Sequence, residues 1–373
     1  MSQKKLSLVT CGVLLSAGSL FAESSIKTAI AAGQASGNVS VYHEKTSQDD
    51  TANADSGFTA GTIGLSYETG YFKGFSAKTS FIAAHEFGEK EEADYEGAFV
   101  NDSLITEAYI KYTNESYSLA IGRQEIDLEW IGDFNEAVIG EVTALENTII
   151  TAGYSHRQAA AGADEIGEFA ELQDSNSKNV NGVFVLDVKY SGIEGLELNP
   201  YYYSASDLAN YYGFKAAYSN DYFGILGHYA ASDEDVTGVK NGNIFHVELS
   251  ASLGPVNFAV GHIATDKDGN VGSLSKFGDN IDPTEEIGDQ VYGDDAKTNY
   301  ATIGTSIEGI DLNLLYASAE YMDSTKKDID EVTFSAGYAL TDELGLSIAY
   351  SDVDGETNSD SFDKISAELT YSF

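Results

Sequence analysis

The side chains that could carry catalysis or bind a metal are the histidines and carboxylates, so their spacing comes first. All six histidines stand singly, outside the HxxxH and HxxE patterns of zinc sites. The stretches DKDGN (266–270) and DVDGE (352–356) begin like calcium loops. Both lack glycine at the sixth loop position and glutamate at the twelfth, which an EF-hand requires. We therefore expect neither a metal nor a cofactor.

Hydrolytic chemistry would need a nucleophile beside a base, and His246 with Glu248 is the nearest approach to such a pair. Two polar residues on one face of a strand are, however, ordinary lining of a water-filled channel. The sequence therefore favours a protein that is not an enzyme. A rim esterase would be the catalytic alternative.

Many charged residues alternate with apolar ones. Between 245 and 253, for example, Phe245, Val247 and Leu249 alternate with His246 and Glu248. A period of two is typical of a strand whose faces meet different solvents. If the more apolar face meets lipid, the opposite face carries Lys78, Glu107, Lys111, Asp187, Lys189, Lys215, His246, Glu248, Lys364 and Glu368.

These segments have roughly the ten residues that a tilted strand needs to cross a bilayer. After the first 22 residues, the sequence contains no run of 18 apolar residues that could form a transmembrane helix. Only helices and closed barrels satisfy every backbone hydrogen bond in lipid. The predicted fold class is therefore all-β, a transmembrane antiparallel β-barrel over residues 35–373.

The connections between strands fall into two populations. Short turns alternate with long acidic segments, the pattern of an outer-membrane barrel. Strict alternation demands an additional, weakly patterned strand at 134–142, and with it the count is 18 strands, with 16 as the alternative. The predicted long segments are 45–56, 87–100, 125–133, 157–179, 205–209, 232–242, 265–297, 322–329 and 354–361.

The first 22 residues have the basic, apolar and small-residue parts of a secretory signal peptide. Residues 23–34 are expected to form a short periplasmic segment. Removing residues 1–22, which contain two lysines and no acid, leaves 18 basic and 60 acidic residues, a formal charge of −42. So acidic a protein is not expected to bind nucleic acid. Cys11 would be removed too, leaving no thiol for disulfide or metal chemistry.

The chain ends on the alternating stretch ISAELTYSF, in which Tyr371 and Phe373 share the apolar face. A terminal aromatic residue is a feature that outer-membrane barrels share. We interpret Tyr371 and Phe373 as the C-terminal signal for the barrel-assembly machinery, at the bacterial outer membrane.

Three stretches resemble the OprD-type porins of Gram-negative bacteria, particularly the forms of Campylobacter-like lineages. They are SIKTAIAAGQASGNVSVYH (25–43), EAYIKYTNESYSLAIGRQ (107–124) and FNEAVIGEVTALENTIITAGYS (134–155). The resemblance implies a passive channel for small anionic or zwitterionic nutrients, with an inward-folded loop and basic side chains at the constriction.

The charges of this chain depart from that implication. Its two arginines are Arg123 and Arg157, and the segment after Arg123 is acidic. By the alternation of its strand, Arg123 lies either at the rim or turned inward at a bulge. Arg157 is two residues from Ser155 and is therefore expected on the same, lumenal face. The constriction candidates are therefore Arg123, Arg157, Glu125, Asp127, Glu129 and Asp133. Whether 125–133, 157–179 or 265–297 folds inward stays open.

The predicted function is passive diffusion of small polar solutes and ions, with selection by pore width and lumenal charge. The predicted wall charges nearly balance, while the loops are strongly acidic, which favours a weak cation preference at low salt. The alternative is a surface-structural or adhesive barrel with an occluded pore. Outer-membrane lipid and lipopolysaccharide are the expected surroundings, and both a homotrimer and a monomer are compatible with the sequence.

Overall fold

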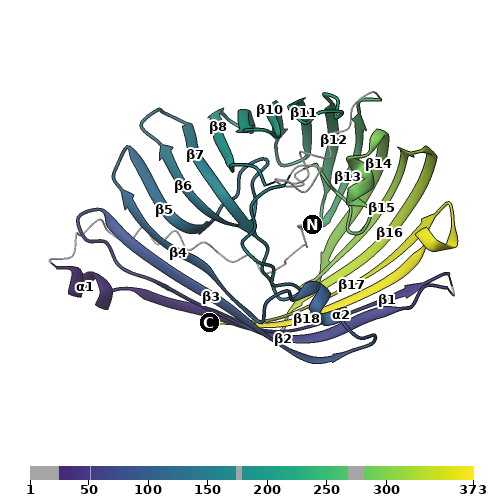
Figure 1. The fold of residues 1–373 in the computed structure, drawn as a ribbon, viewed down its shortest axis with the longest axis horizontal. Coiled ribbons are helices and arrows are strands. Elements are labelled where there is room, and N and C mark those ends of the chain that lie inside the picture. The colour runs from purple at the N-terminus through teal and green to yellow at the C-terminus, as the bar shows by residue number, and fades with distance from the viewer. Residues whose placement is uncertain (1–24, 51, 174–178, 268–280) are drawn as a thin grey trace.

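The computed structural model describes residues 25–50, 52–173, 179–267 and 281–373. Within them, 18 antiparallel strands form a single closed sheet (Figure 1). In chain order they are β1 (Gln34–Gln48), β2 (Ser56–Glu68), β3 (Phe75–Glu89), β4 (Ser103–Thr113), β5 (Tyr117–Glu125), β6 (Phe134–Val142), β7 (Thr148–Ala159), β8 (Val183–Ile193), β9 (Leu196–Ala205), β10 (Ala209–Ser219), β11 (Phe223–Glu234), β12 (Asn243–Leu253), β13 (Val256–Thr265), β14 (Asp294–Ile307), β15 (Ile310–Asp323), β16 (Thr325–Ala339), β17 (Leu344–Gly355) and β18 (Phe362–Ser372).

The sheet closes where the first strand pairs with the last. β1 pairs with β2 on one side and with β18 on the other, from Asn38 opposite Ser372 to Gln48 opposite Phe362. The terminal residue takes part, since the backbone N–H of Gly37 donates to Phe373 and that of Phe373 donates to Gly37. Closure leaves the sheet without an edge, which is the condition for a sheet in lipid.

The sequence prediction of 18 strands is confirmed and the alternative of 16 is excluded. The deciding strand, expected at 134–142 because of the alternation of connections, is β6. It pairs with β5 from Tyr117 opposite Val142 to Glu125 opposite Phe134.

Long and short connections alternate as expected, with one correction. The segment 322–329, predicted as a long loop, is strand except for Ser324, which has a positive φ of 59°. Its charged residues pair with neighbouring side chains, as Lys326 does with Glu320 at 2.6 Å and Lys327 with Asp323 at 3.0 Å. The strands therefore continue through charged sequence, and the expected loop is reduced to Ser324.

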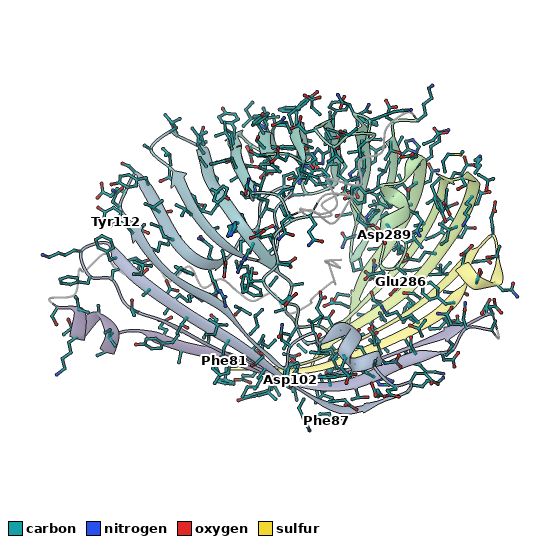
Figure 2. The ribbon with its side chains drawn as sticks, in the orientation of Figure 1. Phe81, Phe87, Asp102, Tyr112, Glu286 and Asp289 are labelled. Atoms are coloured by element: carbon teal, nitrogen blue, oxygen red, sulfur yellow. The ribbon has the colours of Figure 1, made fainter. Side chains whose placement is uncertain are left out.

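The two faces of the sheet differ in polarity. On β1, Val39 and Val41 are exposed on the outside while Ser40 and Tyr42 are buried on the inside. The same alternation brings Phe81, Ile121, Val138 and Phe184 to the outside. Figure 2 shows Phe87 at the outer edge of the barrel and Glu286 toward its interior. An apolar exterior and a polar interior are the arrangement of a barrel in a bilayer.

In the part of the chain that the structure describes, the helices are short and lie before β1 or in the connections between strands. They are α1 (Ile26–Ala31), α2 (Asp94–Ala98), α4 (Gly288–Val291) and the 3₁₀ helix η1 (Asn358–Asp360). α1 lies within the predicted segment 23–34, and a capping box between Ser25 and Thr28 begins it. The predicted signal peptide lies outside the described residues. Among the residues that are described, none of the helices is both long and apolar enough to span a bilayer.

Candidate functional site in the barrel interior

Parts of several long connections fold into the barrel and pack against its inner wall. Trp130 and Ile131, between β5 and β6, are fully buried with Tyr203 and Tyr211 of the wall. Ile281, Ile287 and Val291, between β13 and β14, belong to the same cluster. A second cluster joins Tyr95 and Phe99, from the β3–β4 connection, and Ile166, from the β7–β8 connection, to Tyr42, Phe58 and Ala60 of the wall. Part of each of the three connections that the sequence left open therefore folds inward.

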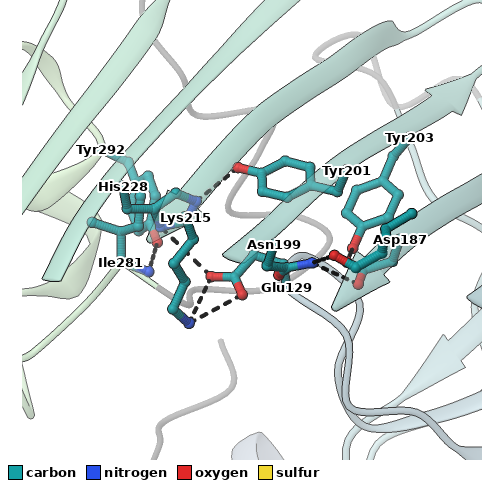
Figure 3. Close-up of polar contacts among 10 residues, drawn as sticks. Glu129, Asp187, Asn199, Tyr201, Tyr203, Lys215, His228, Ile281 and Tyr292 are labelled. Carbon is teal, nitrogen blue, oxygen red and sulfur yellow. Dashed lines mark hydrogen bonds and ion pairs between the residues drawn. The ribbon is translucent and has the colours of Figure 1, made fainter. Parts of the chain in front are cut away.

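The segment 126–133 is held to the far wall by a charged clamp (Figure 3). Its buried Glu129 carboxylate contacts Lys215 Nζ at 3.1 Å and His228 Nδ1 at 3.5 Å. The Nε2 atom of His228 hydrogen bonds with the Tyr201 hydroxyl at 2.8 Å. Lys215 and His228 face each other on β10 and β11. A carboxylate from one connection thus accepts from a lysine and lies against a histidine on two neighbouring strands.

Asp187 on β8 lies beside this clamp, at 1% exposure. Its carboxylate accepts a hydrogen bond from Asn199 Nδ2 at 2.8 Å and another from the Tyr203 hydroxyl at 2.9 Å. A buried carboxylate is stable only when its oxygens have such donors. Figure 3 shows the two groups along one stretch of wall.

A second clamp holds the segment before α4. Lys364 of β18 contacts Glu286 at 3.3 Å and Glu44 of β1 at 3.7 Å. The fully buried Glu331 carboxylate of β16 accepts backbone N–H groups of Glu285, Glu286 and Ile287 at 3.0, 3.0 and 3.2 Å. Charge-assisted bonds of this kind are about twice as strong as neutral ones. The wall thereby fixes both the backbone and the Glu286 side chain of this segment.

Glu286 lies in a connection, outside the spanning strands. Burial raises the pKa of its carboxyl above the ordinary value, and the nearby Lys364 ammonium opposes this shift without cancelling it.

Elsewhere on the wall, Lys78 of β3 contacts the buried Glu107 of β4 at 2.6 Å. Glu107 also accepts the Ser80 hydroxyl at 2.7 Å. Lys111 and Lys189 are both half-buried. Lys111 pairs with the buried Ser76, and Lys189 shares a face of β8 with the buried Asp187. Along β12, His246 Nε2 lies 2.8 Å from the Tyr300 hydroxyl, which donates to Glu248 at 2.6 Å.

Register places both arginines outside the barrel, which corrects their assignment as pore candidates. Ile110, Ile121, Val138 and Tyr154 form one outward row across β4 to β7, and Ala108, Arg123, Glu136 and Arg157 form the next. Parity fails for Arg157 because the register shifts by one residue between Ser155 and Arg157. A bulge moves every following side chain to the other face.

The acidic candidates after Arg123 differ in their exposure to solvent. Glu129 is buried in the clamp, whereas Glu125 and Asp127 are exposed and Asp133 is half-buried with a positive φ of 58°. Glu125, the last residue of β5, pairs with Phe134 in the register that sets Arg123 opposite Glu136. At the closure, the Tyr371 and Phe373 rings stack at 6.1 Å and are both exposed.

Sequence reasoning missed the groups that complete the two clamps. His228 could have been found, because it lies on the face of β11 opposite the exposed Phe223, Ile225 and Tyr229. Glu44 and Glu331 share the inward parity of Tyr42 and Thr333 in their strands. Glu286 carries no such signal, since only the inward path of its connection brings it to Lys364. Among the described residues, histidines and carboxylates form no group of three or more suited to a metal ion.

A closed antiparallel barrel of 18 strands, apolar outside and charged inside, defines a membrane barrel of the outer-membrane type. A family model described as "Putative outer membrane protein" matches residues 26–233, more than half of the 373, and the chain belongs to this family. Its location in the outer membrane follows.

Solved structures with the same fold include OccAB4 of Acinetobacter baumannii, with a TM-score of 0.79 and 12% identity over 91% of this chain and 98% of that one. OccK3 (OpdO) of Pseudomonas aeruginosa has a TM-score of 0.77 and 11% identity over 93% and 97%. OccK8 (OprE) of the same species has 0.73 and 13% over 92% and 98%. The resemblance to OprD-type porins is thereby confirmed for the fold. Among curated protein sequences, none matches this chain.

Proposed function

We propose that the protein is a passive diffusion channel for small polar solutes and ions. The supporting observation is the charged inner wall of a closed barrel of 18 strands, a size at which porins leave an aqueous lumen. The pore lining comprises Lys78, Glu107, Lys111, Asp187, Lys189, Lys215, His246 and Glu248. No bond is made or broken in this function, so it needs neither a catalytic group nor a cofactor.

A weak preference for cations is the second part of the proposal. Three lumenal lysines each contact a carboxylate: Lys78 with Glu107, Lys215 with Glu129, and Lys364 with Glu286 and Glu44. Paired lysines attract anions weakly because their fields are largely cancelled at a distance. The acidic connections then determine the sign of the potential at the mouth.

Planar-bilayer recording with the purified full chain tests both parts. Stable ohmic steps are expected, with a reversal potential under a KCl gradient that indicates a modest excess of K⁺ over Cl⁻. A clear preference for Cl⁻ would overturn the cation proposal while leaving the channel intact. Liposome swelling with sugars, amino acids and organic acids of graded size then measures the width of the pore.

The inward packing of three connections favours a second candidate, a surface-structural or adhesive barrel with an occluded pore. A folded, heat-modifiable barrel that stays electrically silent supports this alternative and excludes the channel. In either case we propose that the strand ending at Tyr371 and Phe373 engages the barrel-assembly machinery. A homotrimer and a monomer are distinguished by mass photometry in detergent.

A further inference from the structure

The two arginines of the sequence meet on the lipid-facing side of the barrel. Both contact Glu136: Arg123 Nη2 lies 2.9 Å from Oε1, and Arg157 Nη1 lies 3.9 Å from Oε2. Glu171 adds a second carboxylate, 3.8 Å from Arg157 Nη2 and 3.6 Å from His156 Nε2. We call Arg123, Glu136, His156, Arg157 and Glu171 the outer arginine cluster.

The cluster lies where the apolar outer band ends. On β5 the outward series runs Leu119, Ile121, Arg123, so the polar row directly follows an apolar one toward the end of the long connections. An open depression at this place is lined by Ile105, Ile121 and Val138 together with Arg123, Glu136 and His156. Apolar side chains on one side of a depression and charged or polar ones on the other suit the junction between the acyl chains of a lipid and its headgroup.

The two arginines have different roles. Arg123 is fully engaged: Nε donates to Glu136 at 3.0 Å, Nη1 donates to the Ile105 carbonyl at 3.1 Å, and the guanidinium carbon lies 4.2 Å from the centre of the Phe169 ring. Arg157 is 42% exposed, and its two carboxylate contacts are beyond hydrogen-bond distance. The N–H donors of Arg157 are therefore available for an external anion.

We propose that the outer arginine cluster binds a phosphate of the lipid A headgroup in the outer leaflet, with an acyl chain against Ile121 and Val138. Arg157 binds the phosphate through its planar fork, a geometry that favours phosphate over other anions. Arg123 and Glu136 position Arg157 rather than contact the lipid. The occupant follows from the position of Arg157. Its contacts with Glu136 and Glu171 are both longer than a hydrogen bond, and it stands where the apolar band ends, at the level where a lipid headgroup meets its acyl chains.

The test measures retention of lipid A by the purified full barrel in detergent, using native mass spectrometry. The probes are bisphosphorylated lipid A, the same lipid after enzymatic dephosphorylation, and phosphatidylglycerol. The variant is Arg157→Gln, and the matched control is Lys326→Gln, a strand residue on the long-connection side that has its own carboxylate partner, Glu320. Because one charge-assisted interaction is lost, we expect roughly tenfold weaker binding for Arg157→Gln and no change for the control.

Equal retention of lipid A by wild type and Arg157→Gln would overturn the proposal, as would equal binding of the dephosphorylated lipid. An equal loss of lipid A binding in Lys326→Gln would show that the lipid is held by general charge attraction and not by a specific site. Arg157→Lys keeps the charge without the fork and is expected to bind with intermediate affinity. Should Arg157→Gln fail to fold, as judged by heat-modifiable electrophoresis, Arg157→Lys with the three lipids decides the question.

Discussion

At the scale of single residues, the clamp around Glu129 gives two substitutions with opposite expected effects. Glu129→Gln leaves Lys215 without its charged partner, so the reversal potential should move toward anions. Lys215→Gln leaves the Glu129 carboxylate with His228 and should move the potential toward cations. The measurement is the K⁺/Cl⁻ permeability ratio in 0.1 M against 0.5 M KCl.

The double variant is the control for this pair. If Glu129 and Lys215 act through each other, the combined change in permeability ratio will be smaller than either single change. Shifts of the same sign for the two single variants would show that loop displacement, rather than charge, controls selectivity.

Glu286 predicts a dependence of selectivity on pH. Its pKa is raised by burial, so on acidification it takes up a proton before an ordinary glutamate does. The docked segment then binds this proton more tightly than the free segment, and docking strengthens as pH falls through the raised pKa. The same step removes a negative charge beside Lys364. We expect the permeability ratio to move toward anions between neutral pH and the range where ordinary glutamates titrate.

Glu286→Gln tests the origin of this pH response. The glutamine keeps the shape of the side chain and cannot titrate, so the variant should start nearer the acid value and respond less to pH. The control is Asp127→Asn in another inward segment, where the acid is exposed. An unchanged response in Glu286→Gln would assign the pH effect to other acids.

At the scale of elements, the connection before α4 depends on a strand residue. Glu331→Ala removes the acceptor of three backbone N–H groups and of the Thr333 hydroxyl. Each charge-assisted bond contributes about 1.5–3 kcal/mol, so the segment 281–287 should leave the wall while the barrel stays closed. Hydrogen exchange is expected to rise in 281–291 and to stay constant in β16. Wild-type protection in 281–291 would contradict this assignment.

The end of the last strand is expected to act in barrel assembly. Deleting Phe373 removes the exposed ring and both backbone hydrogen bonds with Gly37. We expect a lower yield of heat-modifiable barrel in the outer membrane, while Phe373→Tyr should retain the wild-type yield. An unaffected yield for the deletion would remove Phe373 from the assembly signal.

The strands show what sequence can and cannot predict. Alternation and the parity of connections locate β6 to the residue, because both follow from chain geometry. Alternation assigns Lys78 and Lys215 to the correct face of the sheet. It assigns Arg157 to the wrong face, because a bulge reverses the face of every later residue and no local sequence pattern indicates that bulge. The inward paths of the connections depend on contacts between residues far apart in sequence, such as Glu286 with Lys364, which periodicity does not encode.

At the scale of the whole molecule, the acidic excess lies mostly in the connections between strands, so its effect on ion selectivity should depend on salt. The Debye length falls from about 10 Å at 0.1 M salt to about 3 Å at 1 M. We expect the cation preference to decline toward unity over this range at a fixed concentration ratio. A preference that persists at 1 M would place its origin in the lumen, at close range to the ion.

The pairing of Ser40 with Thr370 connects residues 330 positions apart through a hydrogen bond of 2.6 Å. The partner of the first strand is therefore synthesised after all the other strands, and no product that lacks it can complete the cylinder. Insertion must wait for release from the ribosome and export, with β1 protected meanwhile against pairing with the wrong chain. Such long-range pairing is slow, which makes the time between export and insertion the period of greatest aggregation risk.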